Sequence, residues 1–162
     1  MTKNFPKPLL KIGENTILGR MLDDIDGIPE IDEHVIISNH RFAPIFEKWK
    51  MENGKWKKPI RIVDDGTETN ETRLGAVCDL LFAMEKLGID DDMLVVAADN
   101  LLFFSFQEFV DFAKEKGTSC IMCHEQPSIE KLQRTGVVEL DDDFRVLGIA
   151  RSEERRVGKE CR

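Results

Sequence analysis

The sequence predicts a protein of the α/β class, with a doubly wound, mostly parallel sheet. Short apolar segments alternate with longer segments in which apolar residues recur at helical spacing. Residues 93–98, MLVVAA, are apolar without a break, which is typical of a parallel strand covered on both faces. No internal repeat or low-complexity linker interrupts this alternation, so we expect the strands and helices to share one core.

The first 88 residues are expected to contain three helices and two strands. In the first helix the apolar residues from Ile17 to Ile25 fall on one face, and the second helix repeats this spacing. Gly88 follows the third helix, where a left-handed cap is expected. The expected helices are 16–25, 42–51 and 71–87, and the expected strands are 34–38 and 60–63.

The second half of the chain continues the alternation as far as residue 124. Asp99 and Asn100 end the apolar strand at 93–98, and Ser105 with Glu108 forms a capping box ahead of the next helix. The remaining expected elements are a helix at 106–116 closed by Gly117, a strand at 118–124, a short helix at 127–134, and a hairpin of strands at 136–140 and 144–149.

Both ends of the chain depart from this pattern. Pro6 and Pro8 flank Lys7 ahead of the first helix with no strand before them, so the chain is expected to start in the middle of a fold. Residues 151–162, RSEERRVGKECR, lose the apolar pattern and resemble the in-frame translation of a sequencing-library adapter; a genuine charged tail is the alternative. We therefore expect a partial domain at 1–150 and a non-native tail at 151–162.

Composition and charge restrict the class of protein. With 162 residues and 41% apolar content, the chain is long enough for one globular domain with a buried core. The net charge is -8, and residues 151–162 carry five basic and three acidic side chains, which leaves -10 for the rest. We expect neither nucleic acid nor an anionic membrane as partner, while small phosphorylated ligands stay open. The absence of a secretory signal and of a membrane-length apolar run favours a cytoplasmic protein.

The cysteines and histidines offer little support for a metal or redox site. Cys120 and Cys123 have redox or zinc spacing, but no second pair completes four metal ligands, so we interpret them as buried strand residues. The three histidines have no metal-ligand spacing and no partnered nucleophile, and are expected to be structural: His34, His40 and His124.

Asp99 and Lys7 are the candidates for chemistry. Asp99 follows an apolar strand, and ligands of parallel sheets bind beyond the carboxyl ends of the strands, so its carboxylate suits magnesium on a phosphate. The alternative is that Asp99 caps a turn. Lys7 lies where flanking prolines stiffen the backbone, which suits a phosphate clamp; the alternative is a solvated surface lysine.

Two glycines are weaker candidates. The polar loop 64–70, which includes Asp65, leads through Arg73 to Gly75, where a missing side chain lets the backbone approach a base or ribose. Gly136 offers a sugar the same kind of access, although a glycine that starts a hairpin explains it equally well.

Four segments in this order resemble the sugar-phosphate nucleotidyltransferases, in the branch of glucose-1-phosphate thymidylyltransferase and mannose-1-phosphate guanylyltransferase. The segments are PKPLLKIG, DGTETNETRLGA, LVVAADN and GVVELDDDFRVLGIA, and the resemblance spans residues 2–150. It implies a Rossmann-like nucleotidyltransferase core that lacks its first central strand, because the family opens with an apolar strand and a G-x-G-T-R-L loop ahead of the proline-lysine segment. It also implies that the family's later glutamate-lysine-proline motif and second metal-binding aspartate lie beyond residue 150.

The resemblance assigns roles to the candidate residues. It implies that Lys7 and Asp99 are catalytic, with Lys7 on the phosphates and Asp99 as a ligand of Mg²⁺. The nucleotide-binding residues it implies are Lys7, Asp65, Arg73 and Gly75, and the sugar-binding residues are Asn100 and Gly136.

The implied reaction joins a nucleoside triphosphate to a sugar 1-phosphate, giving an NDP-sugar and pyrophosphate. We expect the chain as written to be inactive and its intact parent to be an enzyme. In a strand order 3-2-1-4 the absent strand would lie between 34–38 and 93–98, so two apolar edges are expected to be unpaired and to promote aggregation. The base, the sugar, choline phosphate as acceptor and homo-oligomer formation by the parent stay open. The alternative functions are a noncatalytic nucleotide-sugar binding or regulatory subunit and a glycosyltransferase.

Overall fold

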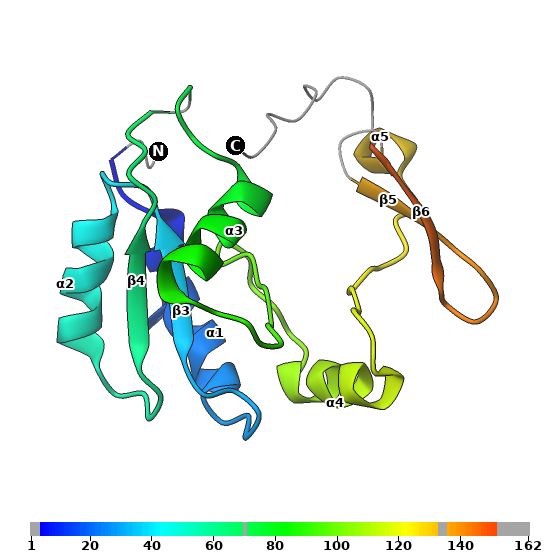
Figure 1. Cartoon of the computed structure of the whole chain (residues 1–162), viewed down its shortest axis with the longest axis horizontal. Helices are drawn as coiled ribbons and strands as arrows, with labels where there is room; N and C mark the ends of the chain where they lie inside the picture. The colour runs from blue at the N-terminus through cyan, green and yellow to red at the C-terminus, as the bar shows by residue number, and fades with distance from the viewer. Residues whose placement is uncertain (1–3, 70, 133–135, 152–162) are drawn as a thin grey trace. The chain divides into compact units, whose positions relative to one another are not determined.

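The computed structural model describes residues 4–69, 71–132 and 136–151, which form two compact units. The first unit is Met1–Gly117 and the second is Thr118–Arg162. Figure 1 draws the described elements along the chain. Apart from Arg151, the tail expected at 151–162 lies outside the described residues, as does the end of the short helix expected at 127–134.

A two-stranded parallel sheet forms the centre of the first unit. Strands β3 (His34–Ser38) and β4 (Ile60–Asp64) pair with His34 opposite Ile60 and Ser38 opposite Asp64. Helix α2 (Ala43–Asn53) joins them, and Figure 1 shows α2 on one side of the pair and α3 (Ala76–Leu87) on the other. The strands expected at 34–38 and 60–63 and the helix expected at 42–51 are therefore confirmed.

The main hydrophobic cluster lies between α2, α1 (Ile17–Ile25) and one face of the sheet. The 3-10 helix η1 (Lys7–Leu9) contributes Leu9 to this cluster. The short strands β1 (Lys11–Ile12) and β2 (Asn15–Thr16), which follow η1 in the chain, pair antiparallel. The N-terminal segment that contains η1 and the β3–β4 sheet thus share one core. The buried members are Leu9, Leu18, Leu22, Phe46 and Trp49, and the sheet contributes Ile36, Ile60 and Ile62.

Side-chain caps start two helices where the sequence predicts them. The Thr16 hydroxyl accepts a hydrogen bond from the Gly19 N–H at 2.9 Å and begins α1. Ser105 accepts from the Gln107 N–H at 3.2 Å at the start of α4 (Phe106–Lys116), where the N–H of Phe106 also donates to the Asp24 carboxylate of α1 at 2.9 Å.

Glycines end two helices as expected, but α3 starts later than predicted. Gly88 and Gly117 adopt φ of +65° and +60° after α3 and α4. Helix α3 begins at Ala76, not at residue 71, because Thr69 and Thr72 form a hydrogen-bonded turn ahead of it. Residues 71–75 therefore belong to the loop.

Residues 93–98 form no strand, so this prediction is wrong. Their exposure alternates as in a strand: Leu94 and Val96 pack against the core, whereas Val95 is 63% exposed. A strand also needs a neighbouring backbone to receive its hydrogen bonds, and none of the described segments pairs with this one. The described sheets are small, parallel and antiparallel, and a wide doubly wound sheet is not confirmed.

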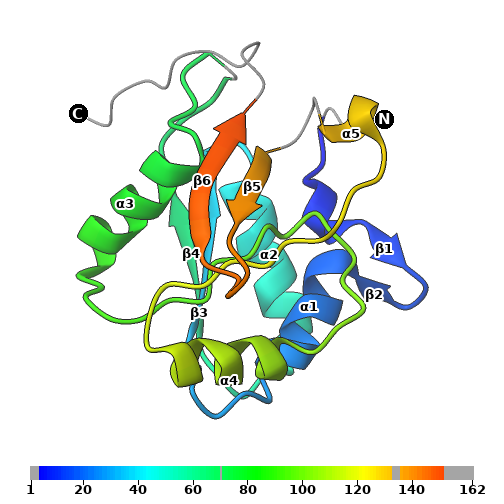
Figure 2. The same cartoon turned by 90° about the vertical axis from the view of Figure 1, so that its right-hand side faces the viewer.

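The second unit contains the expected hairpin. Strands β5 (Gly136–Leu140) and β6 (Val146–Arg151) pair antiparallel, with a register shift between Glu139 and Leu140, and follow the short helix α5 (Ile129–Leu132). Figure 2 shows the two strands side by side. In the turn, the Asp141 carboxylate accepts from the N–H groups of Asp143 and Arg145 at 3.0 and 2.8 Å.

The strand expected at 118–124 is absent. These residues have no ladder partner among the described parts of the chain. Cys120 is half-buried and Cys123 is exposed, and both thiols are free, so the interpretation of this pair as buried strand residues is wrong. As at 93–98, the prediction of a strand rested on a run of apolar residues. The structure shows no strand because none of the described segments pairs with these residues.

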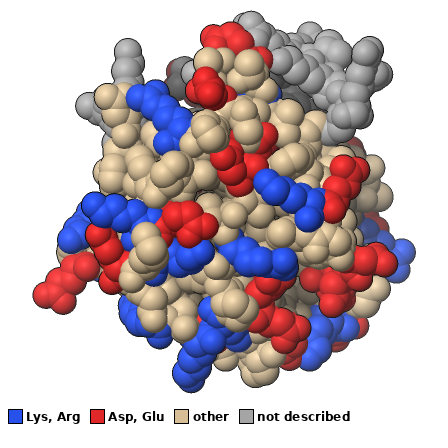
Figure 3. Space-filling model, turned by 60° about the vertical axis from the view of Figure 1, so that its left-hand side comes forward, with Lys and Arg blue, Asp and Glu red and all other residues tan. Residues whose placement is uncertain are grey.

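The described surface mixes charges of both signs. Figure 3 shows basic and acidic side chains interspersed on the face it presents. On α2 two such pairs are local, Lys50–Glu47 at 2.6 Å and Lys48–Glu52 at 3.8 Å, and exposed pairs of this kind contribute little stability. Among the described helices, none combines the length and the apolar character that a membrane crossing requires.

Asp26 offers a test of the core's polar boundary. Its carboxylate accepts from the N–H groups of Lys57 and Lys58 at 2.9 and 3.0 Å and contacts the His34 ring at 3.3 Å. We expect Asp26→Ala to lower the free energy of unfolding by about 1–3 kcal/mol, because it leaves these donors unsatisfied. Urea unfolding measures the loss, and Asp32→Ala, at an exposed position, is the control.

The same contact predicts an acid dependence. Burial tends to raise the pKa of Asp26, but the hydrogen bonds from Lys57, Lys58 and His34 outweigh it and hold the pKa below 3.8. The stability from Asp26 is therefore present at neutral pH and is lost as pH falls through the lowered pKa. In Asp26→Ala this acid-dependent component should be missing; an unchanged acid unfolding profile contradicts the prediction.

The unpaired segment 93–98 predicts fast hydrogen exchange. Amides of Leu94 and Val96 have no ladder partner, whereas those in β3 lie in the parallel pair. We expect the amides at 93–98 to exchange faster than those in β3, as measured residue by residue by NMR. Equal protection of the two segments would show that 93–98 is hydrogen-bonded after all.

Candidate functional site

The carboxyl ends of β3 and β4 bring two loops together. Because the strands are parallel, Ser38 and Asp64 finish at the same edge of the sheet. The loops then hydrogen-bond to each other: the Asp65 N–H donates to the Ser38 carbonyl at 3.0 Å, and the His40 N–H donates to the Thr67 carbonyl at 2.9 Å. The start of the loop at 65–75 is thereby attached to the end of the neighbouring strand.

Aspartate side chains fold the start of this loop. The Asp64 carboxylate accepts from the Gly66 N–H at 2.8 Å, and the Asp65 carboxylate accepts from the Thr67 N–H at 2.7 Å. Gly66 has φ of +74°, and Thr67 is buried. The described residues from 68 to 74 are exposed. The loop is therefore anchored at its start and exposed along the rest of its length.

His40 and Asp64 form an ion pair at this edge. The imidazole Nδ1 lies 2.6 Å from Asp64 Oδ2. The hydrogen bond that the ring donates to Asp64, followed by the charge of Asp64, raises the pKa of His40 above 6.5, and Glu68 adds to the shift. Burial tends to raise the pKa of Asp64, but the Gly66 N–H and His40 outweigh it and lower that pKa below 3.8.

The carboxylates of Asp65, in the loop, and Asp79, in α3, form a second pair of interacting side chains. Burial, then the charge of Asp65 and a hydrogen bond with it, raises the pKa of Asp79, which stands in the first turn of α3. Asp79 therefore keeps a proton at higher pH than an ordinary aspartate does. Its Oδ1 is buried and has no hydrogen-bond partner among the described residues.

Sequence reasoning missed three residues of this edge. It assigned His40 a merely structural role and did not single out Asp64 or Asp79. One signal was available, since Asp64 ends a strand and His40 follows one, and ligands of parallel sheets bind beyond such ends. Of the other histidines, His34 is buried against Asp26, and His124 is exposed.

Lys7 and Asp99 both stand next to the main hydrophobic cluster. Lys7 is exposed in η1, which Leu9 anchors in the core, and Ala98 packs against the same cluster one residue before Asp99. Asp99 is exposed, and its Oδ1 accepts from the Asn100 side chain at 3.2 Å. No ion pair among the described residues joins Lys7 to Asp99.

The remaining predicted residues divide between the two units. Asp65 lies at the start of the loop, Arg73 is exposed within it, and Gly75 ends it with φ of +95°. Gly136 begins β5 in the second unit. The structure thus brings Asp65, Arg73 and Gly75 into one loop of the first unit, whereas Gly136 belongs to the second unit.

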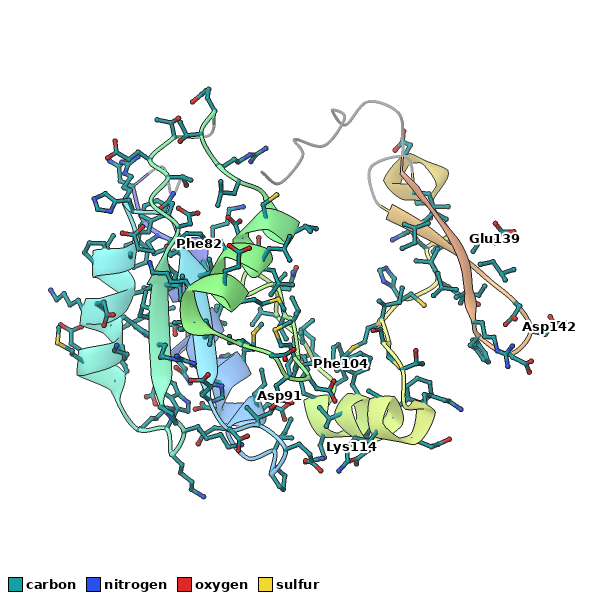
Figure 4. All side chains as sticks on the ribbon, in the orientation of Figure 1. Phe82, Asp91, Phe104, Lys114, Glu139 and Asp142 are labelled. Carbon is teal, nitrogen blue, oxygen red and sulfur yellow. The ribbon has the colours of Figure 1, made fainter. Side chains whose placement is uncertain are left out.

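A cavity of about 340 Å³ opens beside Asn100. Its lining combines a guanidinium, carboxylates and aromatic rings, and Phe104, labelled in Figure 4, meets Phe106 edge to face with ring centroids 5.4 Å apart. Such a lining suits a ligand with both polar and apolar parts. The residues around the cavity are Ile17, Arg20, Met21, Asp23, Asp24, Asn100, Leu101, Leu102, Phe103, Phe104 and Phe106.

The loop geometry predicts that Gly75 does not tolerate a side chain. Its φ of +95° and ψ of 155° are unfavourable for other residues, so Gly75→Ala should lower the free energy of unfolding by about 1–3 kcal/mol. Gly54→Ala is the matched control, since Gly54 also caps a helix but has φ of -64°. Equal effects of the two substitutions in urea unfolding would contradict the prediction.

Comparisons with known proteins identify the family. The nucleotidyl transferase family matches residues 1–151. A 2-C-methyl-D-erythritol 4-phosphate cytidylyltransferase of Thermobifida fusca (strain YX) is 36% identical over 72 residues, which are 44% of this chain and 28% of that protein. The chain thus spans little more than a quarter of the length of this relative. No solved structure matches the chain. The resemblance predicted from the four segments is confirmed, and the chain belongs to the nucleotidyl transferase family.

Proposed function

We propose that the protein encoded by the complete reading frame that contains this sequence transfers a nucleoside monophosphate from a nucleoside triphosphate to a sugar 1-phosphate, giving an NDP-sugar and pyrophosphate. Nucleotidyl transfer follows from the family. The observation that carries the proposed site is the loop at 65–75, anchored where two parallel strands end. Nucleotides bind at this edge of parallel sheets because backbone N–H groups and loop side chains converge there.

The reaction needs positioning more than covalent chemistry. An oxygen of the sugar 1-phosphate attacks the α-phosphorus, and the bond from that phosphorus to the bridging oxygen breaks as pyrophosphate leaves in line with its electron pair. Lys7 would neutralise phosphate charge during this step. Its backbone is stiffened by two prolines and anchored by buried Leu9, which suits a fixed charge.

Asp99 fits a role as one ligand of Mg²⁺. Its carboxylate is exposed and accepts a hydrogen bond from the Asn100 side chain, which leaves the second carboxylate oxygen without a hydrogen bond among the described residues. Magnesium in nucleotide sites is held by one or two carboxylates together with phosphate oxygens, so a single carboxylate suffices on the protein side. The described residues contain no cluster of three metal-ligating side chains. When bound, the ion would offset the negative charge of the triphosphate.

The remaining assignments concern recognition. In the proposal, Asp65, Arg73 and Gly75 contact the nucleotide, and Asn100 and Gly136 contact the sugar. Among the described residues, no heavy atom outside each glycine and its two chain neighbours lies within 4 Å of the position that a Cβ would take on Gly75 or Gly136, which favours the approach of a ligand to both backbones.

A pyrophosphate-release assay tests the reaction. The protein encoded by the complete reading frame that contains this sequence is supplied with Mg²⁺ and each of ATP, CTP, GTP and TTP. Each triphosphate is combined with glucose 1-phosphate, mannose 1-phosphate or 2-C-methyl-D-erythritol 4-phosphate, the last because the similar protein is named for it. Release with a sugar 1-phosphate supports the proposal, whereas release only with the erythritol phosphate assigns another acceptor.

Matched variants test the two catalytic assignments. We expect Asp99→Asn and Lys7→Ala each to reduce kcat/KM by roughly 100- to 1,000-fold, because each removes a charge that the transition state requires. Asp92→Asn and Lys11→Ala are the controls, since both positions are exposed and Asp92 lies at the opposite end of segment 93–98. Equal losses in candidates and controls would refute the assignments.

The noncatalytic alternative makes a different prediction. A nucleotide-sugar binding subunit would bind an NDP-sugar without releasing pyrophosphate from any of the substrate pairs. Isothermal titration with UDP-glucose, TDP-glucose and GDP-mannose, run beside the release assay, separates this alternative from the enzyme.

A further inference from the structure

We propose that His40 is a positioning residue for the nucleotide loop: its imidazole, held on Asp64, fixes the start of the loop at 65–75 against the sheet and so sets the affinity for the nucleoside triphosphate. This inference rests on the proposed function only for the identity of the ligand. The fixing of the loop stands on contacts within the first unit.

His40 holds the loop by two separate bonds. Its backbone N–H donates to the Thr67 carbonyl at 2.9 Å, and its ring contacts the Asp64 carboxylate at 2.6 Å. These partners stand on either side of Asp65 and Gly66. The two bonds together connect Asp64 and Thr67, the two ends of the first turn of the loop, to His40.

His40 is itself attached to a rigid element. Its neighbour Asn39 accepts hydrogen bonds at its carbonyl from Phe42 and Ala43, at 3.1 and 3.0 Å, and at its side chain from Phe42 at 3.0 Å. These contacts join the end of β3 to the start of α2. The histidine therefore projects from a fixed support, as a positioning role requires.

Helix α3 also holds Asp64, through a hydrogen bond from Lys86. The Lys86 ammonium donates to the Asp64 carbonyl at 3.1 Å and lies 5.1 Å from the centre of the Phe82 ring, a residue of α3 labelled in Figure 4. The Asp64 carboxylate also accepts from Gly66 at 2.8 Å. Asp64 is thus the meeting point of β4, the loop, α3 and His40.

The charges around His40 favour its protonated form. Asp64 on β4 and Glu68 in the loop face it, and the ammonium of Lys86 on α3 contacts the Asp64 carbonyl. Because the pKa of His40 is raised, the stabilisation that its charge adds to the contact with ionised Asp64 is fully present below pH 6.5 and is lost as pH rises through the higher folded-state pKa. The loop should loosen over that same interval.

The first experiment measures the loop without any ligand. NMR titration of the His40 ring should give a pKa above 6.5, and Asp64→Asn should lower the His40 pKa. In His40→Gln, the amides of Gly66 and Thr67 should exchange faster at pH 6, and wild-type exchange, corrected for intrinsic rates, should approach that of the variant as pH rises. His124→Gln, exposed in the second unit, is the control and should leave these amides unchanged.

The second experiment measures nucleotide affinity. With the triphosphate selected by the release assay, His40→Gln should raise its KM by roughly 2- to 5-fold, the range expected for a solvent-exposed ion pair, while kcat changes less than twofold. The ratio of the two KM values should shrink as pH rises. Asp79→Asn, measured in parallel, removes the titration of Asp79 and should keep the pH dependence that arises from His40.

The two proposals fail in different ways. If no triphosphate reacts, the proposed function is wrong, and the NMR measurements still decide whether His40 fixes the loop. If Asp64→Asn leaves the His40 pKa unchanged, or if His40→Gln leaves amide exchange at Gly66 and Thr67 unchanged, the positioning role is wrong. A fall in kcat with unchanged KM would overturn it as well.

Discussion

The candidate site depends on the parallel pairing of β3 with β4. The register that sets His34 opposite Ile60 also makes Ser38 and Asp64 end level with each other. The two following turns can then exchange hydrogen bonds, and a loop of more than ten residues is anchored at its start. In an antiparallel pair these two ends would lie at opposite edges, and the loop would have no such support.

Features with local causes were predictable from the sequence. Ser105 caps a helix through its own hydroxyl, and Gly88 ends one through its own backbone freedom, so both signals act within a few residues. The strands expected at 93–98 and 118–124 failed for a different reason. Their apolar pattern states which side chains can be buried, but a ladder depends on a second segment, which a local pattern does not reveal.

For the candidate site as well, the sequence predicted local features but not contacts between distant segments. The sequence analysis expected Asp65 in the loop at 64–70 but Arg73 and Gly75 in a helix at 71–87, whereas the structure places all three residues in one loop, because α3 begins only at Ala76. The pair of His40 and Asp64 escaped notice because 24 residues separate them, and their contact follows from strand register. Titration behaviour such as that of Asp79 is still less accessible, since it depends on burial and on a neighbouring carboxylate.

The cap of α4 has a consequence for the order of folding. The carboxylate that receives the first N–H of this helix belongs to Asp24, 82 positions earlier in the chain, and Phe106 is buried among Met21, Ile25 and Ile28. Closing so long a span costs entropy before any contact compensates for it. Helix α4 is therefore expected to join a partner that has already formed, so that α1 acts as the template on which a distant part of the chain completes its fold.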